Sequence, residues 1–221
     1  MKNKTLTLLL LIFLLVGWPL LSYVVMSSSQ DQLETQLLSR SLQIYLPTIL
    51  IELLVLLLII FVLRRGNENL KTIGFVKFNL RNLLIGIGFL GLAILFLHSI
   101  NSLFQLSTSQ TQKDIFFLLP QTATDKFFWI IMSLVAGICE EAGFRGFVLT
   151  KLNFWIKNWW LTALISSIFF GLGHLYQGLG GVILTGIYGF LFCLVFIWRR
   201  SLFPGIVAHT LQDAIAIFAP I

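Results

Sequence analysis

Seven long apolar runs constrain the fold of this chain more than any other feature of its sequence. Each is about 20 residues long, the length of an α-helix that crosses a bilayer core of ~30 Å. None shows the alternation typical of a β-strand, and no repeat of fixed period links them. The sequence therefore predicts an all-α, polytopic transmembrane helix bundle with about seven spans. The runs cover residues 6–26, 45–63, 82–100, 127–149, 159–175, 181–198 and 202–219.

Composition and the segments between the runs support one membrane domain. Of the 221 residues, 57% are hydrophobic and only 11% are charged, whereas about a quarter of the residues in soluble domains are charged. The polar stretches 27–43 and 101–126 are predicted as loops, so residues 1–221 are predicted to form a single transmembrane domain. The first run is too long for the apolar region of a signal peptide, and no Ala-x-Ala site follows it, so we expect a retained anchor.

The distribution of lysine and arginine predicts the orientation of the chain. Cytoplasmic loops collect these residues, and twelve of the fifteen fall on one side if the N-terminus is cytoplasmic. The exceptions are Arg40, Lys113 and Lys126. The net charge of +6 follows from this bias and suits a surface facing anionic lipid headgroups. The lipid bilayer is therefore a predicted partner, and nucleic acid is not.

Ionisable residues inside the predicted spans are candidate functional residues. A charged side chain at mid-membrane costs at least ~2.5 kcal/mol, so each one needs a partner or a role. Glu52 and His98 lie in spans without a further motif, and we expect them to be interfacial or helix-pairing groups. The others fall in the fourth, fifth and seventh spans: Glu140, Glu141, Arg145, His174, His209 and Asp213.

Helical spacing predicts one ion pair in the fourth span. Glu141 and Arg145 stand at i and i+4 with the acid first, which is the favoured order, whereas Glu140 lies about 100° around the helix. Glu140 is therefore expected to have no partner on its own helix. In an alternative interpretation, Arg145 extends to the interface and both glutamates line a hydrated crevice.

Two further pairs show the same spacing. Phe170 and His174 are four residues apart, so the phenyl ring can pack on the imidazole and fix its orientation. His209 and Asp213 share a helix face, where a carboxylate can hold an imidazole in one tautomer. Each pair alone is weak evidence. A histidine at a helix end is often an interfacial residue, and a structural His–Asp pair between helices has the same spacing.

Taken in order, the three motifs resemble a known family of membrane enzymes. Glu-Glu-x-x-x-Arg, Phe-x-x-x-His and His-x-x-x-Asp on three spans resemble the CAAX-protease and bacteriocin-processing family of intramembrane proteases. This family includes the type II CAAX prenyl endopeptidases and bacterial Abi-type proteins. The resemblance covers about residues 127–219, the expected catalytic core. It implies a peptidase acting on a membrane-associated protein or peptide, in a bacterial inner membrane.

The resemblance also implies roles for individual residues. Glu140 would activate water, Glu141 and Arg145 would support it, and His174 and His209 would be catalytic or would bind a metal. Phe170 would support His174. Position 213 carries Asp where the family more often has Asn. An Asn amide can donate to an oxyanion, so Asp213 would either orient His209 or act as a protonated donor.

The chemistry of peptide hydrolysis leaves two mechanisms open. The reaction needs a general base for water and a hydrogen-bond donor or positive charge near the developing oxyanion. Glu140 can act directly on water with His209 as the donor, or Zn²⁺ can be held by His174, His209 and a carboxylate with Glu140 as the base. The sequence has no His-Glu-x-x-His motif.

A non-catalytic membrane protein is the alternative function. It would be a transporter with a proton relay, or a family member that acts as an immunity or scaffold protein. Transporters commonly show symmetric halves, whereas the ionisable residues here cluster in three spans, which favours an enzyme.

The position of each residue along its predicted helix indicates how deep it lies in the bilayer. At ~1.5 Å per residue, Glu140 and His209 both fall in the inner half of the bilayer. His174, counted from Trp159, falls nearer the outer face. The glycines around His174 permit a close helix approach or a broken helix.

Overall fold

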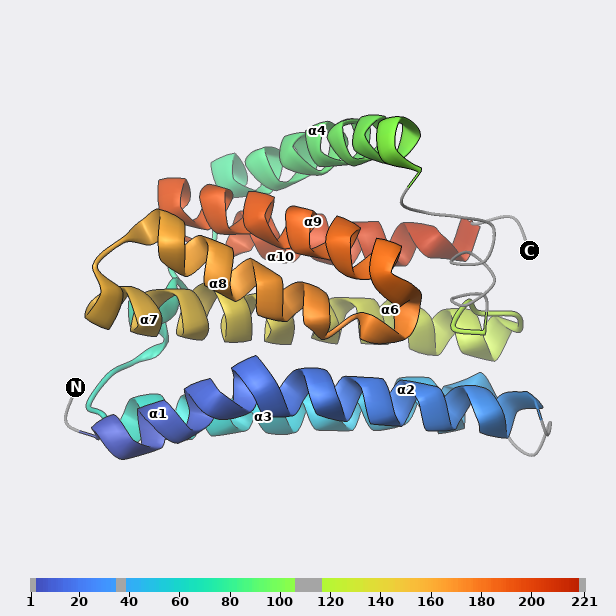
Figure 1. Ribbon diagram of the computed structural model, residues 1–221, viewed down its shortest axis with the longest axis horizontal. Coiled ribbons are helices and arrows are strands. Elements are labelled where there is room, and N and C mark those ends of the chain that lie inside the picture. Colours follow the sequence, from blue (N-terminus) through green and yellow to red (C-terminus); the bar gives the residue numbers. More distant parts are fainter. Residues whose placement is uncertain (1–2, 35–38, 106–116, 219–221) are drawn as a thin grey trace.

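The computed structural model describes residues 3–34, 39–105 and 117–218, and every regular element in these ranges is helical. Figure 1 shows the long helices running roughly along one direction. The N-terminal part forms three rods. Their elements are α1 (Lys4–Ile12), η1 (Phe13–Gly17) and α2 (Trp18–Glu34), then η2 (Ser41–Tyr45) and α3 (Leu46–Arg65), then η3 (Leu70–Ile73) and α4 (Leu80–Phe104).

The C-terminal part contains the three predicted motifs. Its first rod is continuous from α6 through a π-helical segment into α7, and it is followed by a helical hairpin and a last short helix. The elements are α6 (Ala123–Glu140), η4 (Glu141–Val148), α7 (Leu149–Ile156), α8 (Trp159–Leu172), η5 (Leu175–Gln177), α9 (Gly178–Arg199), α10 (Phe203–Ile215) and η6 (Ala216–Phe218).

The predicted transmembrane helix bundle is confirmed. Five helices are long and apolar enough to cross a membrane: Lys4–Ser29, Ser41–Arg65, Leu80–Phe104, Ala123–Ile156 and Leu175–Arg199. The other two predicted spans correspond to the shorter apolar helices Trp159–Leu172 and Phe203–Phe218. Large apolar side chains such as Leu57 and Leu92 point outward, as expected of helices that face lipid. The chain is an integral membrane protein.

The predicted loop at 27–43 is wrong in part, because α2 continues through the polar residues to Glu34 and η2 begins at Ser41. No proline or glycine occurs in this stretch, so the helix continues beyond the apolar window. In the predicted loop at 101–126, α4 extends to Phe104 and α6 begins at Ala123. Lys113 lies outside the described residues.

Close packing of α10 on α6 brings the motifs of the fourth and seventh spans together. Helix α10 packs against both α6 and α4, and α8 packs against α9. Glycine permits this approach, because a Cβ at Gly205 would lie 2.5 Å from Oε2 of Glu141, and a Cβ at Gly137 would overlap Oγ1 of Thr210. Small residues at helix contacts are the usual means of tight packing in a bilayer.

The expectation that His174 lies at a different depth from Glu140 is wrong. Helix α7 continues to Ile156, beyond the predicted end of the span, and only Lys157 and Asn158 separate it from α8. Glu140 is therefore about as many residues before this connection as His174 is after it. Because α8 runs antiparallel to the continuous helix from α6 to α7, the two side chains lie at the same depth. Figure 1 shows the α8–α9 turn well short of the far end of α2, inside the bundle.

Candidate active site

The buried ion pair predicted in the fourth span is present. Nη1 of Arg145 lies 3.0 Å from Oε1 of Glu141, and each side chain is only 1% exposed. Both belong to the π-helical segment η4, a rare geometry that occurs frequently at functional sites. Because Arg145 points into the bundle, the alternative in which it extends to the interface is wrong.

Aromatic rings and a backbone carbonyl complete the surroundings of Arg145. Its guanidinium carbon lies 4.0 Å from the ring centroid of Phe170 and 4.9 Å from that of Phe192. Nη2 also donates to the carbonyl of Gly189 at 3.4 Å. Cation–π contacts strengthen when they are desolvated, so these neighbours help to hold the charge inside the bundle.

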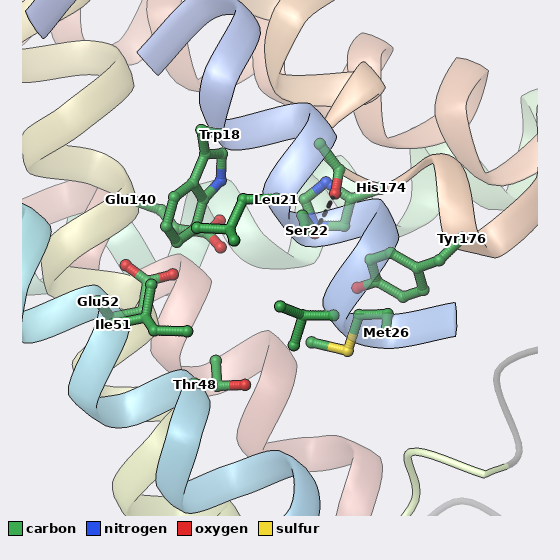
Figure 2. Close-up of a pocket in the computed structure, with 12 residues that line it drawn as sticks. Trp18, Leu21, Ser22, Met26, Thr48, Ile51, Glu52, Glu140, His174 and Tyr176 are labelled. Carbon is green, nitrogen blue, oxygen red and sulfur yellow. Dashed lines mark hydrogen bonds between the residues drawn. The ribbon is translucent and has the colours of Figure 1, made fainter. Parts of the chain in front are cut away.

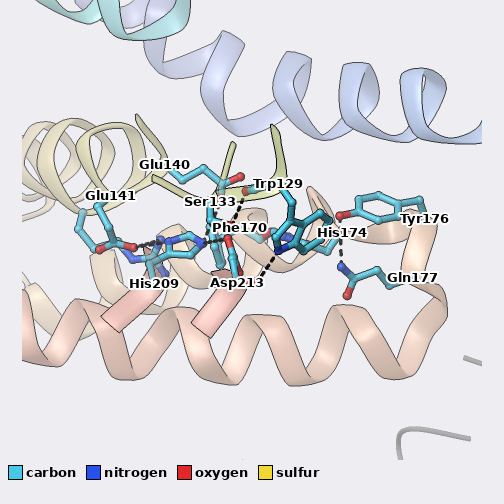
Figure 3. Close-up of polar contacts among 11 residues, drawn as sticks. Trp129, Ser133, Glu140, Glu141, Phe170, His174, Tyr176, Gln177, His209 and Asp213 are labelled. Atoms are coloured by element: carbon cyan, nitrogen blue, oxygen red, sulfur yellow. Dashed lines mark hydrogen bonds and ion pairs between the residues drawn. The ribbon is translucent and has the colours of Figure 1, made fainter. Parts of the chain in front are cut away.

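Three carboxylates surround His209 (Figure 3). Its Nδ1 lies 3.3 Å from Oε1 of Glu141, and its Nε2 lies 3.7 Å from Oε2 of Glu140 and 3.6 Å from Oδ2 of Asp213. Glu141 therefore makes the closest of the three contacts, on the opposite ring nitrogen from Asp213. Packing between helices supplies that contact, whereas the spacing within α10 supplies only Asp213.

Asp213 is held in part through its backbone. Its carbonyl oxygen accepts a hydrogen bond of 2.7 Å from Nε1 of Trp129, which ties α10 to α6. Its side chain is 31% exposed, more than that of the other carboxylates around His209. The predicted pairing of Asp213 with His209 on one helix face is therefore present, but it is the looser contact.

Glu140 presents one oxygen without a direct partner. Oε2 is buried and has no hydrogen-bond partner among the described residues. The distance of 3.7 Å to Nε2 of His209 is too long for a direct hydrogen bond, and a bridging water would satisfy both groups.

His174 is oriented by its own helix. Its Nδ1 lies 3.0 Å from the carbonyl oxygen of Phe170, so an Nδ1–H donates there. The imidazole also packs on the Phe170 ring, with centroids 5.1 Å apart. The predicted contact between Phe170 and His174 is confirmed. With Nδ1 engaged, Nε2 is the nitrogen left for chemistry.

Residues 122–215 match the type II CAAX prenyl endopeptidase Rce1-like family. The matched range, called the Rce1-like segment below, begins just before α6 and ends with α10, and it contains every predicted site residue. The resemblance is therefore confirmed, and it supports a membrane endopeptidase. No curated protein and no solved structure matches the chain.

Two cavities meet the Rce1-like segment on different sides of His174. The first lies against the N-terminal helices and contains Glu140 and His174 beside apolar side chains of α2 and α3 (Figure 2). The second is more polar and contains His174, His209 and Asp213 together with Tyr188 and Gln212. Both histidines therefore border spaces that a substrate or water can enter.

Sequence reasoning missed two features of these cavities. Glu52 is only 2% exposed and lines the first cavity with Glu140, so of the two roles expected for it the interfacial one is wrong, whereas helix pairing fits the packing of α3 on α6. An acidic residue inside an apolar run is the sequence feature that could have marked Glu52 as a functional residue. Tyr188 lines the second cavity with a buried hydroxyl that has no partner among the described residues. A lone tyrosine in an apolar helix gives no such signal.

The arrangement of the histidines does not fit the zinc site considered from the sequence. Among the described residues, no group of three or more His, Cys, Asp or Glu side chains is placed to hold a metal ion. The ring of Phe170 contacts both imidazoles, with centroids 5.1 Å from His174 and 6.2 Å from His209. Zinc normally needs at least three protein ligands in one coordination shell.

Proposed function

We propose that this protein is an intramembrane endopeptidase in which Glu140 activates water and histidines from two other helices assist. One observation carries the proposal: the unpartnered Oε2 of Glu140 faces Nε2 of His209 across 3.7 Å, beside cavities that also reach His174. A base with a free oxygen, opposed by a ring nitrogen, provides the two parts that peptide hydrolysis requires.

In the proposed reaction, Oε2 of Glu140 takes a proton from water as the oxygen attacks the peptide carbonyl carbon. A protonated Nε2 of His209 or His174 donates to the oxyanion of the tetrahedral intermediate. Glu140 then returns its proton to the leaving amine as the C–N bond breaks. Glu141 and Arg145 act as a support that keeps His209 in place.

We propose a membrane-associated protein or peptide as substrate, and a bacterial inner membrane as the location. The basic helix ends support a cytoplasmic N-terminus. At these ends Lys151 pairs with Glu68, and Arg199 donates to Oδ1 of Asn82 at 3.1–3.2 Å. Figure 1 shows the start of α1 at the same end of the bundle as the α7–α8 connection. Thiol labelling of cysteines introduced at residue 3 and at residue 157 tests this, because both should react only from the cytoplasmic side.

The proposed activity is tested with a fluorescence-quenched peptide that ends in a prenylated CAAX sequence. Purified native protein in detergent should cleave it, and the Glu140→Gln variant should be slower by at least about 100-fold, the usual contribution of a general base. Proteomic comparison of cells that carry the native chain or Glu140→Ala extends the test to other substrates. Equal cleavage by both proteins would contradict the proposal. If the native chain produces no cleavage in either assay, the non-catalytic alternative is correct.

A further inference from the structure

A second carboxyl group lies next to Glu140. Glu52 comes from α3, which lies outside the Rce1-like segment and packs against α6, the helix that ends at Glu140. Both line the cavity in Figure 2, where the two carboxyl groups lie at the same end. Glu52 is 2% exposed, so water cannot solvate it as it would a surface carboxylate.

Most of the wall around this pair is apolar, formed by side chains such as Trp18 and Leu21 of α2 and Ile51 of α3. None of the described residues that line it is a lysine or arginine, and its other polar members are Ser22, Thr48, His174 and Tyr176. The buried Arg145 pairs with Glu141 instead. Two ionised carboxylates side by side would repel each other strongly in such a place. They are stable together when they share one proton, as in the carboxyl dyad of aspartic proteases.

A shared proton makes one carboxyl group of the pair the hydrogen-bond donor and the other the acceptor. If Glu140 is to accept a proton from water it must be ionised, so the proton of the pair then lies on Glu52, whose O–H donates to Glu140. Oε2 of Glu140 remains the oxygen that faces His209. One hydrogen bond would thus fix the rotation of the Glu140 carboxylate and leave its reactive oxygen free.

We propose that Glu52 is a positioning residue that holds the Glu140 carboxylate in its reactive orientation by donating a hydrogen bond to it. The inference rests on the proposed role of Glu140 as the base, and it makes the N-terminal helices part of the active site. A residue that serves only packing would be replaced well by an apolar side chain of similar size, because an unpaired buried carboxyl is costly.

Kinetics of two variants separate positioning from packing. Glu52→Gln keeps a donor, and we expect its kcat on the quenched prenylated CAAX peptide to stay within about threefold of the native value. Glu52→Leu removes the donor, and its kcat should fall about 10- to 100-fold with KM within about twofold, as expected for losing one hydrogen bond to a charged group. Ile59→Val, a conservative change at a buried α3 position away from the cavity, should leave both constants unchanged.

Several kinetic outcomes would overturn the proposal. A native kcat in Glu52→Leu would show that the hydrogen bond is unnecessary. Equal losses in the Gln and Leu variants would show that donation to Glu140 is not the function of Glu52. A raised KM with unchanged kcat would assign Glu52 to substrate contact. Thermal unfolding in detergent accompanies each assay, and Glu52→Leu should melt no lower than the native protein.

Infrared difference spectroscopy tests the pair without any substrate. The native protein should show the C=O stretch of a protonated carboxyl that is lost in Glu52→Gln and shifted in Glu140→Gln. No difference between native and Glu52→Gln spectra would overturn the inference. If this band behaves as expected but no peptide is cleaved, the proposed enzyme activity fails while the carboxyl pair stands. If the native protein cleaves peptide and Glu52→Leu does so equally well, only the role of Glu52 fails.

Discussion

Oε1 of Glu141 contacts both Nη1 of Arg145 at 3.0 Å and Nδ1 of His209 at 3.3 Å. One buried carboxylate therefore joins the π-helical segment of the fourth span to α10. Arg145 depends on it for a negative charge inside the bundle, whereas His209 also has Glu140 and Asp213 within 4 Å. Among the described residues, Oε2 of the adjacent Glu140 has no hydrogen-bond partner, and under the proposed function this difference makes Glu141 the structural and Glu140 the reactive glutamate.

Glu141→Gln should destabilise the protein, whereas Glu140→Gln should leave its stability close to native. Removing one partner of a buried ion pair typically costs about 3–5 kcal/mol, because the other charge stays buried without compensation. Thermal unfolding in detergent measures the difference. In the double variant Glu141→Gln, Arg145→Met, part of the lost stability should return, since the uncompensated cation is gone. Equal melting temperatures for the two single variants would contradict this division of roles.

Gly205→Ala should lower both stability and activity. The added Cβ would lie 2.5 Å from Oε2 of Glu141, so α10 must move away from α6 and carry His209 with it. Overpacking of this kind typically costs about 1–3 kcal/mol. Gly88→Ala on α4 is the matched control, because its Cβ would meet nothing within 4 Å. We expect the control to melt at or slightly above the native temperature, and a native-like Gly205→Ala would show that the close approach is dispensable.

Asp213→Asn should keep the fold and most of the activity. Glu141 makes the closer contact to His209, and the Trp129 bond goes to the backbone of residue 213, which the substitution preserves. An Asn amide can in addition donate to the oxyanion. We expect a rate within about fivefold of native, the scale of one ordinary hydrogen bond. Cleavage is measured from mildly acid to alkaline pH, and a loss beyond about tenfold at every pH would assign the orienting role to Asp213.

Chelators should not abolish cleavage. His174 and His209 do not converge with a third ligand among the described residues, so we expect the purified protein to stay active in 1,10-phenanthroline. Elemental analysis should find zinc well below one equivalent. A full equivalent that disappears in both His174→Ala and His209→Ala, with activity lost in parallel, would establish the metal mechanism instead.

The sequence alone determined the features that depend on one helix at a time. The length of each apolar run predicted the spans, and spacing of four residues predicted the contacts of Glu141 with Arg145 and of Phe170 with His174. These contacts follow from helix geometry itself, which places such neighbours on one face whatever surrounds them. The three motifs also sufficed to predict the family that residues 122–215 match.

Only the tertiary structure decided which helices share a site. The contact of Glu141 with His209 and the cavity shared by Glu52 and Glu140 depend on the rotation and depth of separate helices, which no spacing within a helix reports. Glu140 and His174 lie at the same level because α7 continues to Ile156, a helix end that the sequence did not predict. Helix packing in a bilayer is set by small residues and shape at each contact, so an ionisable group such as Glu52 acquires its neighbours only when the bundle is assembled.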